Sequence, residues 1–289
     1  MQYRPYRSVL YIPAARARAL DKARGLATDA IIFDLEDAVA PTEKAAARDV
    51  LVAELTAGGY GNRAQIVRIN GYDTEWGRDD LAAVAAARPQ AVLLPKVNTA
   101  IDIDHLSAQM DADDRFADTK IWAMMETPDG ILNAAAIAKA PRLQGMVMGT
   151  NDLAKDLGTR YDPARLPMVA ALGHCVLAAR AAGIAIVDGV YNAFRDDDGL
   201  RAECNQGRDM GFDGKTLIHP AQLDITNEIF APTAGDIDLA RRQIEAFDAA
   251  VAAGEGVAVV DGKIVENLHA DTARATLAKA DAIAMMGAA

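Results

Sequence analysis

The chain has few cysteines, few histidines and a shortage of positive charge. Two cysteines, Cys175 and Cys204, are too few for a disulfide framework or a cysteine-rich metal site, which favours a reduced setting inside the cell. The four histidines show neither an H-x-H nor an H-E-x-x-H spacing, which argues against zinc. With 30 Lys and Arg against 41 Asp and Glu, the net charge is −11. Because nucleic acids and membrane surfaces bind basic faces, this balance argues against both as partners.

Long hydrophobic runs are also lacking. The most apolar stretch, Met168–Ala179, contains His174, is closed by Arg180, and is shorter than the about 20 apolar residues of a membrane-spanning helix. The N-terminal segment MQYRPYRSVLYIP has no apolar core long enough for a signal peptide. An apolar fraction of 51% and a charged fraction of 25% are typical of a globular protein. We therefore expect a soluble, cytoplasmic protein.

What the sequence does contain is a series of short runs rich in Val, Ile and Leu. They are Ser8–Pro13, Ala30–Leu35, Gln65–Asn70, Ala91–Val97, Lys120–Glu126, Gly145–Gly149, Gly183–Asp188 and Asp213–Ile218. Most are continuous rather than alternating, as in parallel strands buried on both faces. Segments of helical character lie between them, such as Ala17–Ala27, Glu43–Leu55 and Pro163–Ala182. Eight alternations predict an α/β fold, a (β/α)8 TIM barrel. An open doubly wound sheet gives the same alternation, but no G-x-G-x-x-G follows the first run.

The chain continues beyond the last of these runs. The pattern predicts a barrel over residues 1–230, ending with a helix at Ala221–Phe230, and a C-terminal extension over residues 231–289. The extension reads as a helix at Gly235–Ala253, a hairpin turning at Asp261-Gly262, and a final Ala-rich helix. Because it is too small for a separate core, we expect it to pack on the barrel or to reach a neighbouring subunit.

Ionisable residues follow nearly every predicted strand. They are Arg16, Glu36 with Asp37, Arg68, Lys96, Glu126, Asp152, Asp188 and His219. The carboxyl ends of the strands of a TIM barrel carry its active site. A purely structural barrel has no need of such a ring, so the pattern indicates an enzyme.

Two carboxylates in this ring are candidate metal ligands. Glu126 in METPDG and Asp152 in GTNDL end the fifth and sixth predicted strands, and neighbouring strands lie about 5 Å apart. Two carboxylates with several waters suit Mg²⁺. The alternatives are a helix N-cap for Asp152 and a rim salt bridge for Glu126.

Arginine and lysine residues near the N-terminus are candidates for binding anions. Arg68, in VRING, presents a planar fork that suits a carboxylate or a developing oxyanion, or else pairs with Glu36 or Asp37. The first 24 residues are rich in basic side chains, and two of them, Arg16 and Lys22, lie just past the first strand where phosphates could be met.

The motifs RSVLYIPA, FDLEDAVAP, VRING, LLPKV, METPDG, GTNDLA, VDGVYNAF and GKTLIHPAQ occur in this order. In these segments the chain resembles the CitE-like acyl-CoA lyases of the HpcH/HpaI aldolase superfamily over almost its whole length. That family includes citrate lyase β-subunits, malyl-CoA and citramalyl-CoA lyases and malyl-CoA thioesterases. In WAMMET, MVMGTNDLAK and GVAVVDGKIVENLH the sequence is most similar to the (3S)-malyl-CoA thioesterase branch.

The resemblance implies a TIM barrel assembled as a homotrimer or a dimer of trimers. It implies that Glu126 and Asp152 hold Mg²⁺, with Mn²⁺ as a substitute, and that Arg68 faces the reacting acyl group. Tyr11, Arg16 and Lys22 match positions that contact coenzyme A in malyl-CoA lyases, although the family has a phenylalanine where this chain has Tyr11.

One departure from the family pattern concerns the C-terminal hairpin. The lyases carry there an aspartate that enters the neighbouring subunit's site as acid/base, and the matching residue here is Glu266, in KIVENL. The extra methylene moves the carboxylate by about 1.5 Å, and displacements near 1 Å can cost on the order of 10²-fold in rate. We therefore expect weakened C–C cleavage with thioester hydrolysis retained. Alternatively, Glu266 replaces the aspartate in an ordinary lyase.

The resemblance thus implies Mg²⁺-dependent hydrolysis of (3S)-malyl-CoA to malate and coenzyme A. One alternative is a lyase that cleaves malyl-CoA, β-methylmalyl-CoA or citramalyl-CoA to an acyl-CoA and a 2-oxo acid. A second is a divalent-metal aldolase that releases pyruvate. A third is a component like the citrate lyase β-subunit, which works with an acyl carrier protein.

Overall fold

The computed structural model describes residues 4–287. Eight parallel strands form a closed barrel in the order β1 to β8, and β1 closes it by pairing with both β2 and β8. The strands are β1 (Ser8–Pro13), β2 (Ala30–Asp34), β3 (Ala64–Arg68), β4 (Ala91–Leu94), β5 (Lys120–Met125), β6 (Leu143–Met148), β7 (Ala185–Asp188) and β8 (Gly214–Leu217). The predicted TIM barrel is confirmed.

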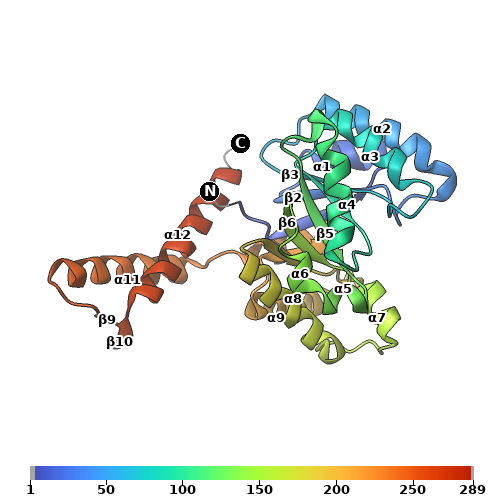
Figure 1. Ribbon diagram of the computed structural model, residues 1–289. Helices are drawn as coiled ribbons and strands as arrows, with labels where there is room; N and C mark the ends of the chain where they lie inside the picture. The colour runs from blue at the N-terminus through green and yellow to red at the C-terminus, as the bar shows by residue number, and fades with distance from the viewer. Residues whose placement is uncertain (1–3, 288–289) are drawn as a thin grey trace. The chain divides into compact units, whose positions relative to one another are not determined.

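Helices lie around the strands (Figure 1). They are α1 (Ala17–Ala23), α2 (Lys44–Ala57), α3 (Gly77–Ala87), α4 (Ala100–Asp111), α5 (Pro128–Leu132), α6 (Ala134–Ile137), α7 (Thr150–Leu157), α8 (Val169–Ala182) and α9 (Asp197–Met210). Short 3₁₀ turns occur at Pro41–Glu43, Asp114–Phe116, Leu166–Met168 and Pro220–Gln222.

The predicted helix Ala17–Ala27 ends already at Ala23, and two further differences from the predicted boundaries lie beside residues with a left-handed backbone. The predicted helix Pro163–Ala182 begins only at Val169, after a 3₁₀ turn, because Arg165 adopts φ 54° and interrupts any helix there. The predicted strand Ala91–Val97 ends at Leu94, because Lys96 adopts φ 51°. The backbone conformation of these residues, rather than hydrophobicity, sets the two ends.

The barrel interior is apolar along most of its length and carries charged residues at the carboxyl ends of the strands. Side chains in a strand alternate between the two faces, so residues two apart share a face. Inward positions include Val9, Ile32, Ile66, Leu93, Trp122 and Val147, which form one buried cluster. Two residues further along β2 and β3, the same face presents Asp34 and Arg68, which are register partners. Alternation therefore carries the charged residues to the barrel mouth.

A buried ionic cluster joins β7 and β8 to α9. Lys215, on β8, lies 3.4 Å from Asp188 Oδ2 and donates a hydrogen bond to Glu203 Oε1 at 2.5 Å. Arg165 Nη1 donates to both carboxylate oxygens of Asp188 at 2.8 Å. All four side chains are buried. The expectation that Asp188 contributes to the active-site rim with the other strand-end residues is therefore wrong, because its carboxylate pairs with Lys215 and Arg165 inside this buried cluster.

Replacing Lys215 with Met is expected to destabilise the barrel, because Asp188 and Glu203 would keep their buried charges with only Arg165 left as a cation between them. Breaking a buried pair costs about 3–5 kcal/mol. Urea unfolding followed by circular dichroism measures the change. The exposed Lys139 is the matched control, and Lys139→Met should leave stability within about 0.5 kcal/mol. A loss below about 1 kcal/mol for Lys215→Met contradicts the structural role given to the cluster.

Contacts divide the chain into two compact units, of which Tyr6–Asn227 holds the barrel. Of the described residues, the other unit holds 4–5 and 228–287. The helix α10 (Leu223–Phe230) ends in it, followed by α11 (Ala234–Ala252), β9 (Ala258–Val260), β10 (Lys263–Val265) and α12 (Asn267–Gly287).

The C-terminal unit has a small core of its own, made of Phe247, Val265 and Ala270 with two flanking hairpin residues, so the expectation that it is too small for a separate core is wrong. Asp261 and Gly262 both have positive φ, 51° and 73°, as a type I′ turn requires, so the predicted hairpin is confirmed. That this unit reaches a neighbouring subunit stays a prediction. Within residues 4–287, no helix has the length and apolar character needed to cross a membrane.

Candidate active site

A pocket of about 390 Å³ opens at the carboxyl ends of the barrel strands. Its wall includes Tyr11, Asp34, Arg68, Met124, Glu126 and Asp152, together with Gly149–Asn151 at the start of α7. Active sites of TIM barrels occupy this end of the fold. The four predicted site residues Tyr11, Arg68, Glu126 and Asp152 therefore meet in one pocket.

Arg68 is held by Asp34, which faces it across the β2–β3 register. Arg68 Nε donates to Asp34 Oδ1 at 2.7 Å and Nη2 donates to Oδ2 at 2.6 Å, a bidentate pair. The backbone N–H groups of Glu36 and Ala38 also donate to the Asp34 carboxylate. Burial by itself would lower the pKa of Arg68, but its neighbours, chiefly the charge and hydrogen bonds of Asp34 together with the charge of Glu36, raise that pKa well above its usual value. Asp34 thus fixes the plane of the guanidinium.

Asp34 was not among the candidate residues predicted from sequence. Its signal lies in the spacing, because Asp34 stands two residues after Ile32 and so shares its inward face. The expected partners, Glu36 and Asp37, are also near. Arg68 Nη1 lies 2.6 Å from Glu36 Oε2 and 3.8 Å from Asp37 Oδ2. Burial raises the pKa of Glu36 to about 7, against the lowering effect of Arg68.

Glu126 follows β5 and is 2% exposed. Its Oε1 accepts a hydrogen bond of 2.8 Å from the backbone N–H of Lys96, whose left-handed conformation directs that N–H toward it. Burial raises the pKa of Glu126 to about 7, although this hydrogen bond and Arg68 lower it. A cation bound beside this buried carboxyl would further stabilise its charged form.

Asp152 lies in the first turn of α7 rather than at the end of β6, so its predicted place at a strand end is wrong. Gly149 is the N-cap residue, so the alternative of Asp152 as helix cap is also wrong. The Asp152 side chain is 32% exposed, and its Oδ2 lies 3.6 Å from Lys96 Nζ. Its negative charge contributes to the raised pKa of Glu126, and both carboxylates line the same pocket.

The donor set of Glu126 and Asp152 fits a hard cation that keeps part of its water shell. No group of three or more His, Cys, Asp or Glu side chains within residues 4–287 is arranged to hold a metal by itself. Mg²⁺ commonly takes one or two carboxylates and fills its remaining positions with water and substrate oxygens. The open pocket beside Glu126 and Asp152 leaves room for such ligands.

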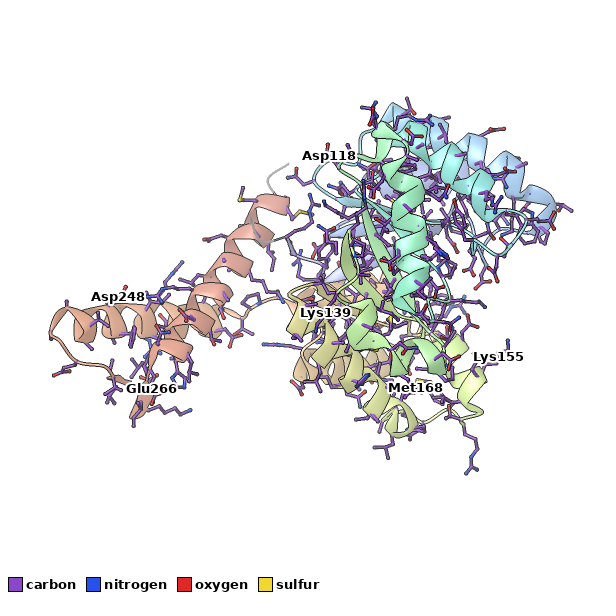
Figure 2. The ribbon with its side chains drawn as sticks, in the orientation of Figure 1. Asp118, Lys139, Lys155, Met168, Asp248 and Glu266 are labelled. Atoms are coloured by element: carbon purple, nitrogen blue, oxygen red, sulfur yellow. The ribbon has the colours of Figure 1, made fainter. Side chains whose placement is uncertain are left out.

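The three remaining predicted residues lie outside the pocket wall. Arg16 is at the N-cap position of α1 and Lys22 is in its last turn, and both side chains are exposed. Glu266 belongs to the C-terminal unit, between β10 and α12 (Figure 2). Its side chain is exposed, and its backbone N–H donates to His269 Nδ1 at 3.0 Å. The roles of these three residues stay predictions.

Gly149→Ala is expected to weaken Mg²⁺ binding, because an added Cβ would meet Glu126 Oε2 at 2.4 Å and displace that carboxylate. Loss of ligand positioning commonly costs about 10–100-fold in metal affinity. Isothermal titration calorimetry with Mg²⁺ measures it. Gly173→Ala is the control, because its Cβ would enter open space on α8. Unchanged Mg²⁺ affinity in a folded Gly149→Ala protein would remove Glu126 from the metal site.

The fold and the pocket together define a TIM barrel with carboxylates and an oriented arginine at its strand ends. The model of the HpcH/HpaI aldolase/citrate lyase family matches residues 7–220, and the chain belongs to this family. The resemblance noted from the sequence motifs is thereby confirmed, and the chain is an enzyme of this type.

Two curated relatives and one solved structure are similar to the chain over nearly its whole length. A (3S)-malyl-CoA thioesterase of Cereibacter sphaeroides is 65% identical over 283 residues, covering 98% of this chain and 97% of that protein. The citrate lyase subunit beta of Escherichia coli is 36% identical over 284 residues, covering 96% and 94%. Among solved structures, CitE of Mycobacterium tuberculosis in complex with magnesium, acetoacetate and coenzyme A is 29% identical, with a TM-score of 0.77 and coverage of 96% and 98%.

Proposed function

We propose that the protein hydrolyses (3S)-malyl-CoA to malate and coenzyme A with the help of a divalent cation. The observation that carries the proposal is the pocket in which an oriented guanidinium, Arg68, faces the same space as Glu126 and Asp152. The 65% identity to a (3S)-malyl-CoA thioesterase over nearly the whole chain supports the substrate. The similarity to a CitE structure holding magnesium and coenzyme A supports the cofactor and the thioester class.

The wall of the pocket offers binding groups for two parts of the malyl group. Glu126 and Asp152 would hold Mg²⁺, which supplies positive charge for the oxygens of the hydroxyacyl group. The first turn of α7, Thr150–Asp152, borders the same pocket. The first N–H groups of a helix have no partner within the helix and favour an anion, so this turn suits the free carboxylate of the malyl group.

Arg68 is placed to stabilise negative charge on the thioester oxygen. A guanidinium has five N–H donors, and the bidentate pair with Asp34 uses two of them. Donors fixed in advance at a developing oxyanion need no rearrangement during the reaction. The same geometry serves the enolate of a C–C lyase, which keeps the lyase as the second candidate function.

Glu266 is the proposed acid/base, supplied by a neighbouring subunit of a homotrimer or a dimer of trimers. The C-terminal unit that carries it exposes large apolar side chains. Val257, Val259, Ile264 and Leu268 are between 47% and 67% exposed. Apolar groups gathered on one small unit favour contact with another protein surface. A contact made through these apolar side chains would bring the nearby carboxylate of Glu266 to the active site of the neighbouring subunit.

The setting of the enzyme follows from its composition. Cys175 and Cys204 are free and buried, which is consistent with the cytoplasm as the proposed location.

Mn²⁺ is a proposed substitute for Mg²⁺, because both accept carboxylate and water oxygens.

The central test incubates the purified protein with (3S)-malyl-CoA and follows free thiol and glyoxylate in parallel. We expect thiol release without matching glyoxylate, and loss of activity with EDTA that Mg²⁺ restores. Glu126→Gln is expected to lower kcat/KM at least about 100-fold, because the amide loses the ligand charge. Asp118→Asn, the same chemical change at an exposed residue, should leave the rate unchanged (Figure 2). Glyoxylate release without net thiol would assign the lyase reaction instead.

The trans role of Glu266 is tested by mixing two inactive variants, Glu126→Gln and Glu266→Gln. Each homo-oligomer lacks one group in every site, whereas a mixed oligomer brings together an intact Glu126 and an intact Glu266 from different chains. We expect co-refolded or co-expressed mixtures to regain activity well above either variant alone. No recovery places Glu266 and Glu126 of one site on the same chain, and full activity of Glu266→Gln alone removes Glu266 from the reaction.

A further inference from the structure

The hydroxyl group of Tyr11 has only a weak acceptor in the pocket. Tyr11 lies on β1 with its side chain in the barrel mouth, and its Oη donates to Met124 Sδ at 3.3 Å. A thioether sulfur accepts hydrogen bonds poorly, so this donor is available for a stronger acceptor that enters the pocket. The pocket around it is lined by Arg68 and Glu126, the residues assigned above to the reaction.

The ring of Tyr11 is held against the guanidinium of Arg68. The Arg68 carbon Cζ lies over the ring, 5.1 Å from its centroid, in a cation–π contact. Because two hydrogen bonds to Asp34 fix the orientation of the Arg68 guanidinium, the Tyr11 ring packs against a group that does not rotate freely. The Tyr11 side chain and the guanidinium of Arg68 both line the pocket and therefore border one space.

The hydroxyl stays protonated near neutral pH. Burial raises the pKa of Tyr11 above its ordinary value, against the lowering effect of Arg68, while the charges of Asp34, Glu126 and Glu36 raise it further. A neutral phenol offers a hydrogen bond to an oxygen that gains negative charge, as an oxyanion hole does.

We propose that Tyr11 is a catalytic residue whose hydroxyl, together with Arg68, donates a hydrogen bond to the thioester oxygen of the substrate. This inference rests on the proposed function. In the reaction, water adds to the thioester carbon and the carbonyl electron pair moves onto the oxygen. The pair returns as the C–S bond breaks, and the thiolate of coenzyme A takes up the proton that the water loses. Tyr11 keeps its own proton and supplies only the hydrogen bond.

Tyr11→Phe removes the hydroxyl and keeps the ring against Arg68. We expect kcat for thiol release from (3S)-malyl-CoA to fall about 100-fold, with KM raised by no more than about 10-fold, because the lost hydrogen bond is present in the bound substrate and strengthens in the transition state. Tyr60→Phe is the matched control. Tyr60 is buried, its hydroxyl donates to the backbone oxygen of Leu20 at 3.3 Å, and it does not line the pocket. This control should retain wild-type kinetics.

A binding measurement separates Tyr11 from the proposed reaction. Isothermal titration calorimetry compares coenzyme A with the malyl-CoA analogue in which CH₂ replaces the thioester sulfur, a ketone that keeps the carbonyl oxygen. Tyr11→Phe should bind coenzyme A like wild type and the ketone about 10-fold more weakly. Equal binding of the ketone by both proteins, or wild-type kcat in Tyr11→Phe, overturns the role of Tyr11. A wild-type protein that releases no thiol overturns the hydrolysis alone, because the ketone comparison still decides Tyr11.

Discussion

The buried ion pair between Asp34 and Arg68 is the interaction on which the candidate site depends. It joins the last residues of two neighbouring barrel strands, and both oxygens of Asp34 are used twice, by the guanidinium and by backbone N–H groups of the following loop. A buried guanidinium without this partner would carry a large desolvation cost. With it, Arg68 is a fixed cation at the barrel mouth, against which the Tyr11 ring packs.

Around this fixed cation the pocket holds an excess of negative charge. Glu36 and Glu126 are both buried and both have a pKa raised to about 7, so Arg68 and Lys96 do not compensate them fully. The side chain of Asp152 adds a further carboxylate at the open edge. A divalent cation between Glu126 and Asp152 would restore the balance. This charge balance agrees with the divalent cation proposed above.

Much of the site could be predicted from the sequence, because a parallel barrel places strand ends at one rim whatever its exact dimensions. Arg68 and Glu126 follow directly from this rule, and Asp152 reaches the pocket from the first helical turn beyond its strand. The same rule misplaced Asp188, since a strand-end carboxylate can equally turn outward and pair with a lysine under a helix. Which of these happens depends on the face of the strand and on partners distant in sequence.

By itself, the sequence determined the fold class, the set of strands, the tight hairpin turn at Asp261-Gly262 and the family, because periodicity, turn chemistry and motif order are local properties of the chain. Only the tertiary structure decided that Asp34 holds Arg68, that Lys96 turns its backbone N–H to Glu126, and that the Tyr11 hydroxyl meets a sulfur. The physical reason is that these contacts join residues from different strands. Barrel closure, register and burial set their distances and charges, and no short stretch of sequence contains that information.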